Sequence, residues 1–226
     1  MLTIILAESE LEVMPSELVN HPLITSFAHQ RRKQPERILL DSNYHHVAMK
    51  DLVDGRRRGR PDIVHLFLLT ALESIANKKS QLKIIIHTRH DDVIYINPET
   101  RIMRNYDRFV GLIEQLFEKK VVRSQEQTLL ELKQKVPLKK LIEELKADKI
   151  IAFSEEGKVT NLNKYLNDLK KHKEKNIVCI IGGFPSGKFN CDIESIAADI
   201  ISIYPEMLVA WAVASEILVN YEIVYL

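Results

Sequence analysis

The feature that most constrains the fold is a short apolar run that ends in a glycine-rich loop. Residues 177–181 are apolar and mostly β-branched, which is typical of a strand buried on both faces of a parallel sheet. The segment 182–190 follows at once and contains Gly182, Gly183 and Gly187. Ligands of open α/β sheets bind outside the carboxyl ends of the strands. This loop is therefore the first candidate for a binding site.

Similar apolar runs alternate with helical patterns along the chain. Further strands are predicted over residues 2–7, 82–87, 93–97, 150–153 and 199–204, the second and third of them forming a hairpin. Helices are predicted over residues 16–29, from Pro61 onward, over 106–120, 138–145 and 162–169, and from about 206. This alternation predicts an α/β fold with a mostly parallel sheet flanked by helices.

The length of 226 residues favours one domain with an insertion over two full domains. We expect a single domain over residues 1–226, with an additional segment within roughly 31–60 and a helical region over 124–150. The chain begins without a basic segment, and its apolar run at 207–219 contains Glu216 and is too short to cross a bilayer. With only two cysteines, these features predict a cytoplasmic protein that does not enter a membrane.

The glycine-rich loop permits three interpretations. Gly182 and the pair Gly187-Lys188 have the spacing of a phosphate-binding P-loop, but Phe189 stands where that motif needs a hydroxyl for magnesium. A P-loop-like nucleotide-binding protein is therefore a weaker alternative, and a glycine-rich turn without a ligand is another. A second strand end, at Ser202 to Pro205, favours a cleft between two adjacent strand ends that holds an adenine and a ribose.

Arginines gather in two stretches although the net charge of the chain is only +1. The second stretch straddles a predicted start of a helix, with spacings of three and four residues that place its arginines on one side. Such local excess suits phosphates and bases, so we expect one face to bind a polyanion. For the first stretch, solvated arginines before a helix capped by Asp62 are the structural alternative. The two stretches are Arg56, Arg57, Arg58 and Arg60, and Arg101, Arg104 and Arg108.

A group of metal-ligating residue types occurs once, at the predicted tip of the hairpin. It consists of His87, His90, Asp91 and Asp92. Because the sequence places no further ligands beside them, we expect no metal site there.

The order and spacing of three groups of residues resemble the sequence pattern of one known family. The chain is similar to the SPOUT-class ribosome biogenesis methyltransferases called nucleolar essential protein or essential for mitotic growth, and to their archaeal members in particular. The groups are Arg60 to His65; Ile96 to Pro98 with Arg101, Arg104, Arg108 and Phe109; and Gly182, Gly187 and Lys188 with Ser202 to Pro205.

The resemblance implies both a fold and an activity. It implies a trefoil knot near the C-terminus, a homodimer, and S-adenosyl-L-methionine as the cofactor. The implied reaction is methylation of N1 of a pseudouridine in small-subunit ribosomal RNA during ribosome biogenesis, with ribosomal proteins as further partners. A non-catalytic assembly factor that binds the same RNA is the alternative function.

The resemblance also implies roles for single residues. Asp62 and Arg60 match catalytic positions, and Arg60, Arg101, Arg104 and Arg108 match positions that face RNA. We expect Asp62 to orient the base rather than accept its proton, because a carboxylate beside several arginines is a weak base. The positions implied for the cofactor are Ala152, Phe153, Gly182, Gly187, Lys188, Ile201, Ser202, Ile203, Tyr204, Pro205 and Glu206.

Overall fold

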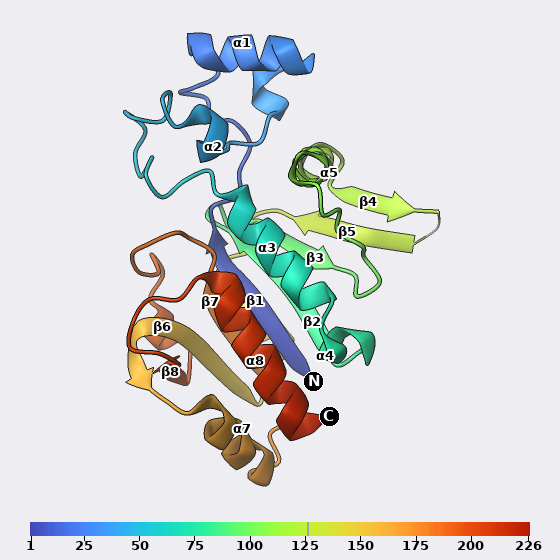
Figure 1. Cartoon of the computed structure of the whole chain (residues 1–226), viewed down its shortest axis with the longest axis vertical. Helices are drawn as coiled ribbons and strands as arrows, with labels where there is room; N and C mark the ends of the chain where they lie inside the picture. Colours follow the sequence, from blue (N-terminus) through green and yellow to red (C-terminus); the bar gives the residue numbers. More distant parts are fainter. Residues whose placement is uncertain (126) are drawn as a thin grey trace.

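The computed structural model describes residues 1–125 and 127–226, and within these ranges eight strands form one sheet in the order β4-β5-β3-β2-β1-β7-β6-β8 (Figure 1). Strand β1 lies at its centre and is buried along its whole length. The strands are β1 (Leu2–Ser9), β2 (Leu82–Thr88), β3 (Val93–Ile96), β4 (Val121–Ser124), β5 (Gln127–Lys133), β6 (Lys149–Val159), β7 (Ile177–Gly182) and β8 (Asp199–Ser202).

The sheet has a parallel part and an antiparallel part. Strands β2, β1, β7, β6 and β8 run parallel to one another, whereas β3, β5 and β4 continue the sheet beyond β2 in antiparallel pairs. The predicted hairpin around residues 88–92 is the antiparallel pair of β2 and β3. The prediction of a mostly parallel α/β sheet is thus confirmed, and its parallel part carries the glycine-rich loop.

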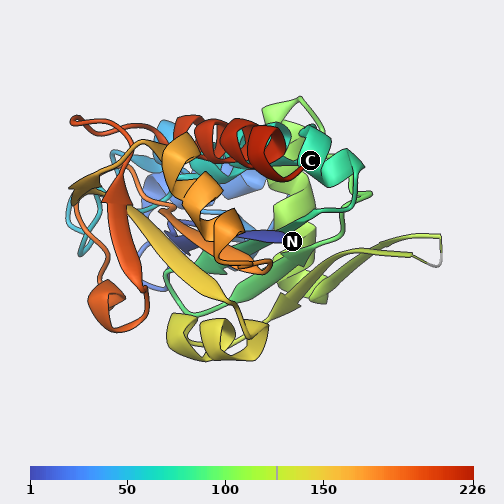
Figure 2. The ribbon, with the colours of Figure 1, turned by 90° about the horizontal axis from the view of Figure 1, so that it is seen from below.

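Helices cover both faces of the sheet. Four of them pack on one face: α3 (Pro61–Leu72), α5 (Tyr106–Lys119), α7 (Leu162–Lys171) and α8 (Ala210–Tyr225). The opposite face is covered by α6 (Leu138–Leu145) and by the segment 189–197. Figure 2 shows α8 and α6 on opposite sides of the strands. The short helix α4 (Ile75–Lys78) lies between α3 and β2. None of these described helices has the length and apolar character that a bilayer crossing needs.

Residues between β1 and α3 form an insertion that extends away from the sheet (Figure 1). It contains α1 (Pro22–Arg31), the 3-10 turn η1 (Pro35–Arg37) and α2 (Ser42–His45) around a small apolar cluster of its own. Ion pairs from its basic side chains to α5 fix its position. These are Arg31 with Asp107, Lys33 with Glu114 and Arg37 with Glu118.

Three element predictions are wrong in detail. The helix expected over residues 16–29 begins only at Pro22. The region 124–150, expected to be helical, contains strand β5 before α6. Its buried Leu130 and Leu132 alternate with the partly exposed Glu131, which is the period of a strand, and this strand pairs with β3. The last helix begins at Ala210 rather than near 206, since residues 203–209 follow the rim of a pocket instead.

Candidate functional site

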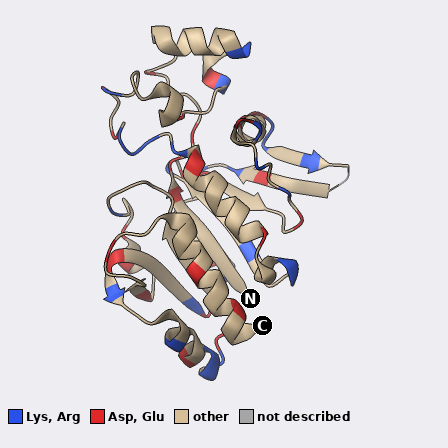
Figure 3. Cartoon of the chain, in the orientation of Figure 1, with Lys and Arg blue, Asp and Glu red and all other residues tan. Residues whose placement is uncertain are grey.

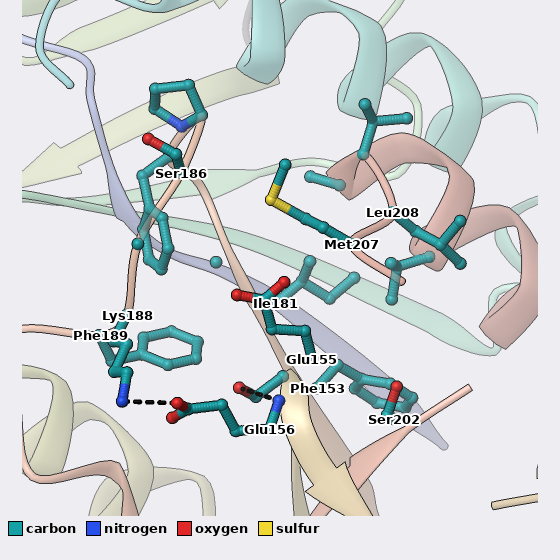
Figure 4. Close-up of a pocket in the computed structure, with 18 of the residues that line it drawn as sticks. Phe153, Glu155, Glu156, Ile181, Ser186, Lys188, Phe189, Ser202, Met207 and Leu208 are labelled. Carbon is teal, nitrogen blue, oxygen red and sulfur yellow. Dashed lines mark hydrogen bonds and ion pairs between the residues drawn. The ribbon is translucent and has the colours of Figure 1, made fainter. Parts of the chain in front are cut away.

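A pocket opens where β6, β7 and β8 end, at the carboxyl edge of the parallel strands (Figure 4). Its walls come from the loop after β7, the second half of β6, the loop after β8 and the first turns of α8. Arg60 and Ile63, at the start of α3, complete the rim. This is the position that the topology of an open α/β sheet predicts for a ligand.

The two predicted strand ends meet at this pocket, but they are not adjacent. Strand β6 lies between β7 and β8 in the sheet. Its pairing with β8 is interrupted after Phe153 and resumes at Lys158, so Ser154, Glu155 and Glu156 bulge toward the pocket between the two loops. The bulge requires Gly157, because a Cβ there would lie 2.5–2.8 Å from the backbone of Ile201.

Nine of the eleven residues predicted to bind a cofactor line this pocket. Ala152 does not, because it precedes Phe153 in a strand and its side chain is buried on the opposite face of the sheet. Pro205 does not line it either and is exposed to solvent. The nine lining residues are Phe153, Gly182, Gly187, Lys188, Ile201, Ser202, Ile203, Tyr204 and Glu206.

Sequence reasoning missed the apolar wall of the pocket. Met207, Leu208 and Val209 line it and are exposed, and Trp211 in the first turn of α8 lies beside them. The sequence gives no signal for this wall, because the apolar run that starts at Met207 continues without a break into α8 and fits the start of a helix.

The glycine-rich loop has a conformation that does not suit a P-loop. Gly187 has φ +86°, and the Phe184 and Phe189 rings meet edge to face with centroids 5.3 Å apart. The loop leads only into the 3-10 turn Ile193–Ser195, whereas a P-loop places its phosphates at the N-terminus of an α-helix. The geometry therefore argues against the P-loop alternative.

An ion pair joins two walls of the pocket. Lys188 Nζ lies 2.5 Å from Glu156 Oε1, which links the glycine-rich loop to β6 (Figure 4). The hydrogen bond to Glu156 raises the pKa of Lys188. Both side chains are exposed, so their pairing adds little to stability and is easily rearranged by a ligand.

Arg60 and Asp62, the predicted catalytic pair, bind each other beside the pocket. The guanidinium donates from Nε to Asp62 Oδ1 at 2.8 Å and from Nη2 to Oδ2 at 2.7 Å. The hydrogen bond to Asp62 raises the pKa of Arg60. Each side chain remains 28% exposed, so solvent or a ligand can still reach the pair.

Arg101, Arg104 and Arg108 lie in the segment before α5 and in its first turn, and α5 packs on α3. The segment that carries them is fastened to α3 by a hydrogen bond between His65 Nε2 and the Met103 carbonyl, 2.8 Å apart. All three arginines are exposed, and within residues 1–125 and 127–226 none forms an ion pair with a carboxylate. Their role in binding RNA stays a prediction.

In the first arginine stretch, Arg57 and Arg58 bind carboxylates of the protein, whereas a polyanion was the predicted partner. Arg57 pairs with Glu8 and Glu10, and Arg58 with Glu12, so these two guanidinium groups neutralise buried carboxylates inside the protein. Figure 3 shows this mixture of basic and acidic residues where the insertion joins the sheet and α3 begins. Only Arg56 of the stretch is exposed.

Comparison with known proteins agrees with this geometry. Residues 4–222 match the family model described as EMG1/NEP1 methyltransferase. The chain belongs to this family. Among its relatives, the protein named Ribosomal RNA small subunit methyltransferase Nep1 from Pyrococcus furiosus is 48% identical over 98% of this chain and 96% of its own length. The protein of the same name from Thermoplasma volcanium is 40% identical over 98% of this chain and 97% of its own length.

A solved relative has the same fold as this member of the EMG1/NEP1 family. The crystal structure of Archaeoglobus fulgidus Nep1 bound to S-adenosylhomocysteine superposes with a TM-score of 0.86 at 34% sequence identity. The match covers 98% of this chain and 97% of that chain. The resemblance in the sequence is thereby confirmed for both family and fold.

The steric role of Gly157 can be tested against a second glycine. Gly157→Ala should lower the free energy of unfolding by about 2 kcal/mol, because the new methyl group forces β6 and β8 apart. Gly111→Ala, on an open face in the interior of α5, should raise it by about 1 kcal/mol through helix propensity. Urea unfolding of both variants measures the difference. Equal effects at the two positions would show that the bulge of β6 tolerates a side chain.

Proposed function

We propose that this protein transfers a methyl group from S-adenosyl-L-methionine to N1 of a pseudouridine in small-subunit ribosomal RNA, in the cytoplasm. The observation that supports this most is the pocket at the ends of β6, β7 and β8, in a fold shared with a relative that binds S-adenosylhomocysteine. The names of the relatives support ribosomal RNA of the small subunit as the substrate. The position of the methyl group on the base is our inference from the family resemblance.

The residues present fit an adenosyl cofactor. Apolar side chains, among them Leu208 and Trp211, provide a surface for the adenine, and the loops after β7 and β8 bring backbone amides and carbonyls to the same cavity. Glu155 and Glu156 place carboxylates on the pocket wall, where they favour the positive charge of a sulfonium and an amino group. The pocket thus combines an apolar part and an acidic part, as the two halves of this cofactor require.

The remaining residues position the acceptor base. The cofactor, when bound, supplies an electrophilic methyl group, and the reaction then depends on holding the acceptor nitrogen against it. Asp62 is held by two hydrogen bonds from Arg60. Its carboxylate oxygens keep lone pairs that can accept a further hydrogen bond from an N–H group at the edge of a base. Arg101, Arg104 and Arg108 bind the phosphates around a nucleotide that is flipped out of its loop.

Homodimer formation is supported by exposed apolar side chains on three helices. Exposed apolar side chains come from three neighbouring helices that contact one another, α3, α4 and α8. Exposed apolar side chains on neighbouring helices are typical of a protein interface. The side chains are Leu66, Ile75, Val219 and Ile223, which are 38%, 56%, 49% and 69% exposed.

The C-terminal knot of the family is supported by the path of the chain. After β7 the segment 189–197 packs on one face of the sheet, and β8 then joins the edge beyond β6. The chain next returns to the opposite face, where α8 contacts α3 and α7. A trefoil knot requires such a change of face.

Binding and methyl transfer can be measured separately. We expect S-adenosylhomocysteine to bind in the presence of EDTA, and ATP with magnesium not to bind, by isothermal titration calorimetry. We further expect methylation of an RNA hairpin that contains pseudouridine and none of the same hairpin with uridine, because uridine has no N1–H. Binding of RNA without cofactor binding would support the non-catalytic assembly factor instead.

The role of Asp62 can be tested by Asp62→Asn. If Asp62 orients the base, kcat should fall about 10-fold through the loss of one charge-assisted hydrogen bond, with RNA affinity little changed. A loss of about 1000-fold would indicate a proton acceptor instead. Asp107→Asn, which removes an exposed carboxylate paired with Arg31, is the matched control. Unchanged turnover would exclude Asp62 from the reaction.

The dimer surface can be tested with a single charge. Ile223→Asp should shift the protein from dimer to monomer in light scattering coupled to gel filtration, because an unpaired carboxylate in an apolar interface is strongly unfavourable. Val53→Asp alters another exposed apolar residue, in the insertion, and should leave the dimer intact. A dimer that persists in Ile223→Asp would place the interface elsewhere.

A further inference from the structure

One side chain of the insertion, Arg57, reaches the wall of the pocket. Its Nη1 donates a hydrogen bond to the Lys188 carbonyl at 2.7 Å. Its guanidinium also lies over the Phe184 ring, 3.8 Å from the centroid. Phe184 and Lys188 both line the pocket, so Arg57 contacts the glycine-rich loop from behind at two points.

Two buried glutamates at the end of β1 hold Arg57 in this position. Its Nε donates to Glu10 Oε1 at 2.7 Å, and its Nη2 donates to Glu8 Oε2 at 3.0 Å. The side chains of Glu8 and Glu10 are 7% and 0% exposed, and that of Arg57 is 15% exposed. Charged hydrogen bonds shielded from water in this way are strong and directional.

Glu8 also fastens the far end of the same loop. Its carboxylate accepts hydrogen bonds from the backbone amides of Asn190 and Cys191, each at 2.8 Å. Glu8 itself has φ +49°, a left-handed conformation that is unfavourable for a residue other than glycine. The surrounding contacts must therefore maintain it. Arg57 and Glu8 therefore hold the loop at three backbone groups, the Lys188 carbonyl and the Asn190 and Cys191 amides.

The loop depends on these contacts for its shape. Between the end of β7 at Gly182 and the 3-10 turn at Ile193 the described chain has no helix or strand of its own. Without regular backbone hydrogen bonds, side chains from outside the loop must fix its conformation. Arg57 does so from the insertion, a different part of the chain.

We propose that Arg57 is a positioning residue for the methyl donor: it holds the loop 184–190 in the conformation that binds the cofactor, and so makes cofactor affinity depend on the insertion. This inference rests on the proposed function, since it assigns the pocket to S-adenosyl-L-methionine. In Arg57→Gln, Glu10 keeps Arg89, whose Nη1 lies 2.6 Å from Glu10 Oε2. Glu8 loses its ion pair and keeps the hydrogen bonds from the Asn190 and Cys191 amides.

The test compares Arg57→Gln with a matched control. Arg37→Gln also removes an arginine that joins the insertion to the body of the protein, but its partner Glu118 lies on α5, away from the pocket. Trp211 is the only tryptophan of the chain and lines the pocket, so its fluorescence reports binding of S-adenosylhomocysteine. We expect at least about 10-fold weaker binding for Arg57→Gln and no change for Arg37→Gln. A smaller loss is expected for Phe184→Leu, which removes only the ring contact.

Three further measurements separate positioning from a general loss of stability. KM for the donor should rise in Arg57→Gln while kcat changes little, and Arg57→Lys should recover part of the affinity by restoring the charge. In the ligand-free protein, hydrogen exchange should become faster at the Asn190 and Cys191 amides, with exchange in the core strands unchanged. Equal donor affinity in Arg57→Gln and Arg37→Gln, or unchanged hydrogen exchange in the loop, would overturn the proposal. If the unsubstituted protein fails to bind S-adenosylhomocysteine, the proposed function is refuted, and loop exchange still decides whether Arg57 positions the loop.

Discussion

The structure around the site depends on the pairing of three buried glutamates where β1 ends. Glu8, Glu10 and Glu12 are almost fully buried, and an unpaired carboxylate in that environment would be very costly. Their partners Arg57, Arg58 and Arg89 come from the insertion and from the turn between β2 and β3. Burial alone would raise the pKa of Glu12, but hydrogen bonds from Arg58 and His90 outweigh it and lower that pKa. Charge pairing thus joins the insertion, the hairpin and the glycine-rich loop at one point.

Parallel strands explain why the pocket lies beside this point. The carboxyl ends of β1, β7, β6 and β8 lie at one edge of the sheet, so the loops that leave them are neighbours although they are far apart in sequence. Helix α3 begins at the same edge. The proposed cofactor pocket and the exposed arginines therefore lie on either side of α3.

Local patterns in the sequence predicted most of the fold, and the family resemblance predicted most of the residues that line the pocket. The buried strand at 177–181 and the amphipathic helices have unambiguous periods, and all of them are present. The roles of Arg57 and Arg58 could not be predicted, because their partners lie 46 to 49 positions earlier in the chain and only the fold brings them together. The position of β6 between β7 and β8 could not be predicted for the same reason, since strand order is a property of the whole sheet.

A crystal structure of this protein grown with S-adenosylhomocysteine would show whether the loops after β7 and β8 enclose the methyl donor, as we propose. We expect density for the adenosine between the glycine-rich loop and residues 201–209, with the sulfur facing Arg60 and Asp62. Density at another site, or an unaltered pocket at saturating ligand, would refute the proposal.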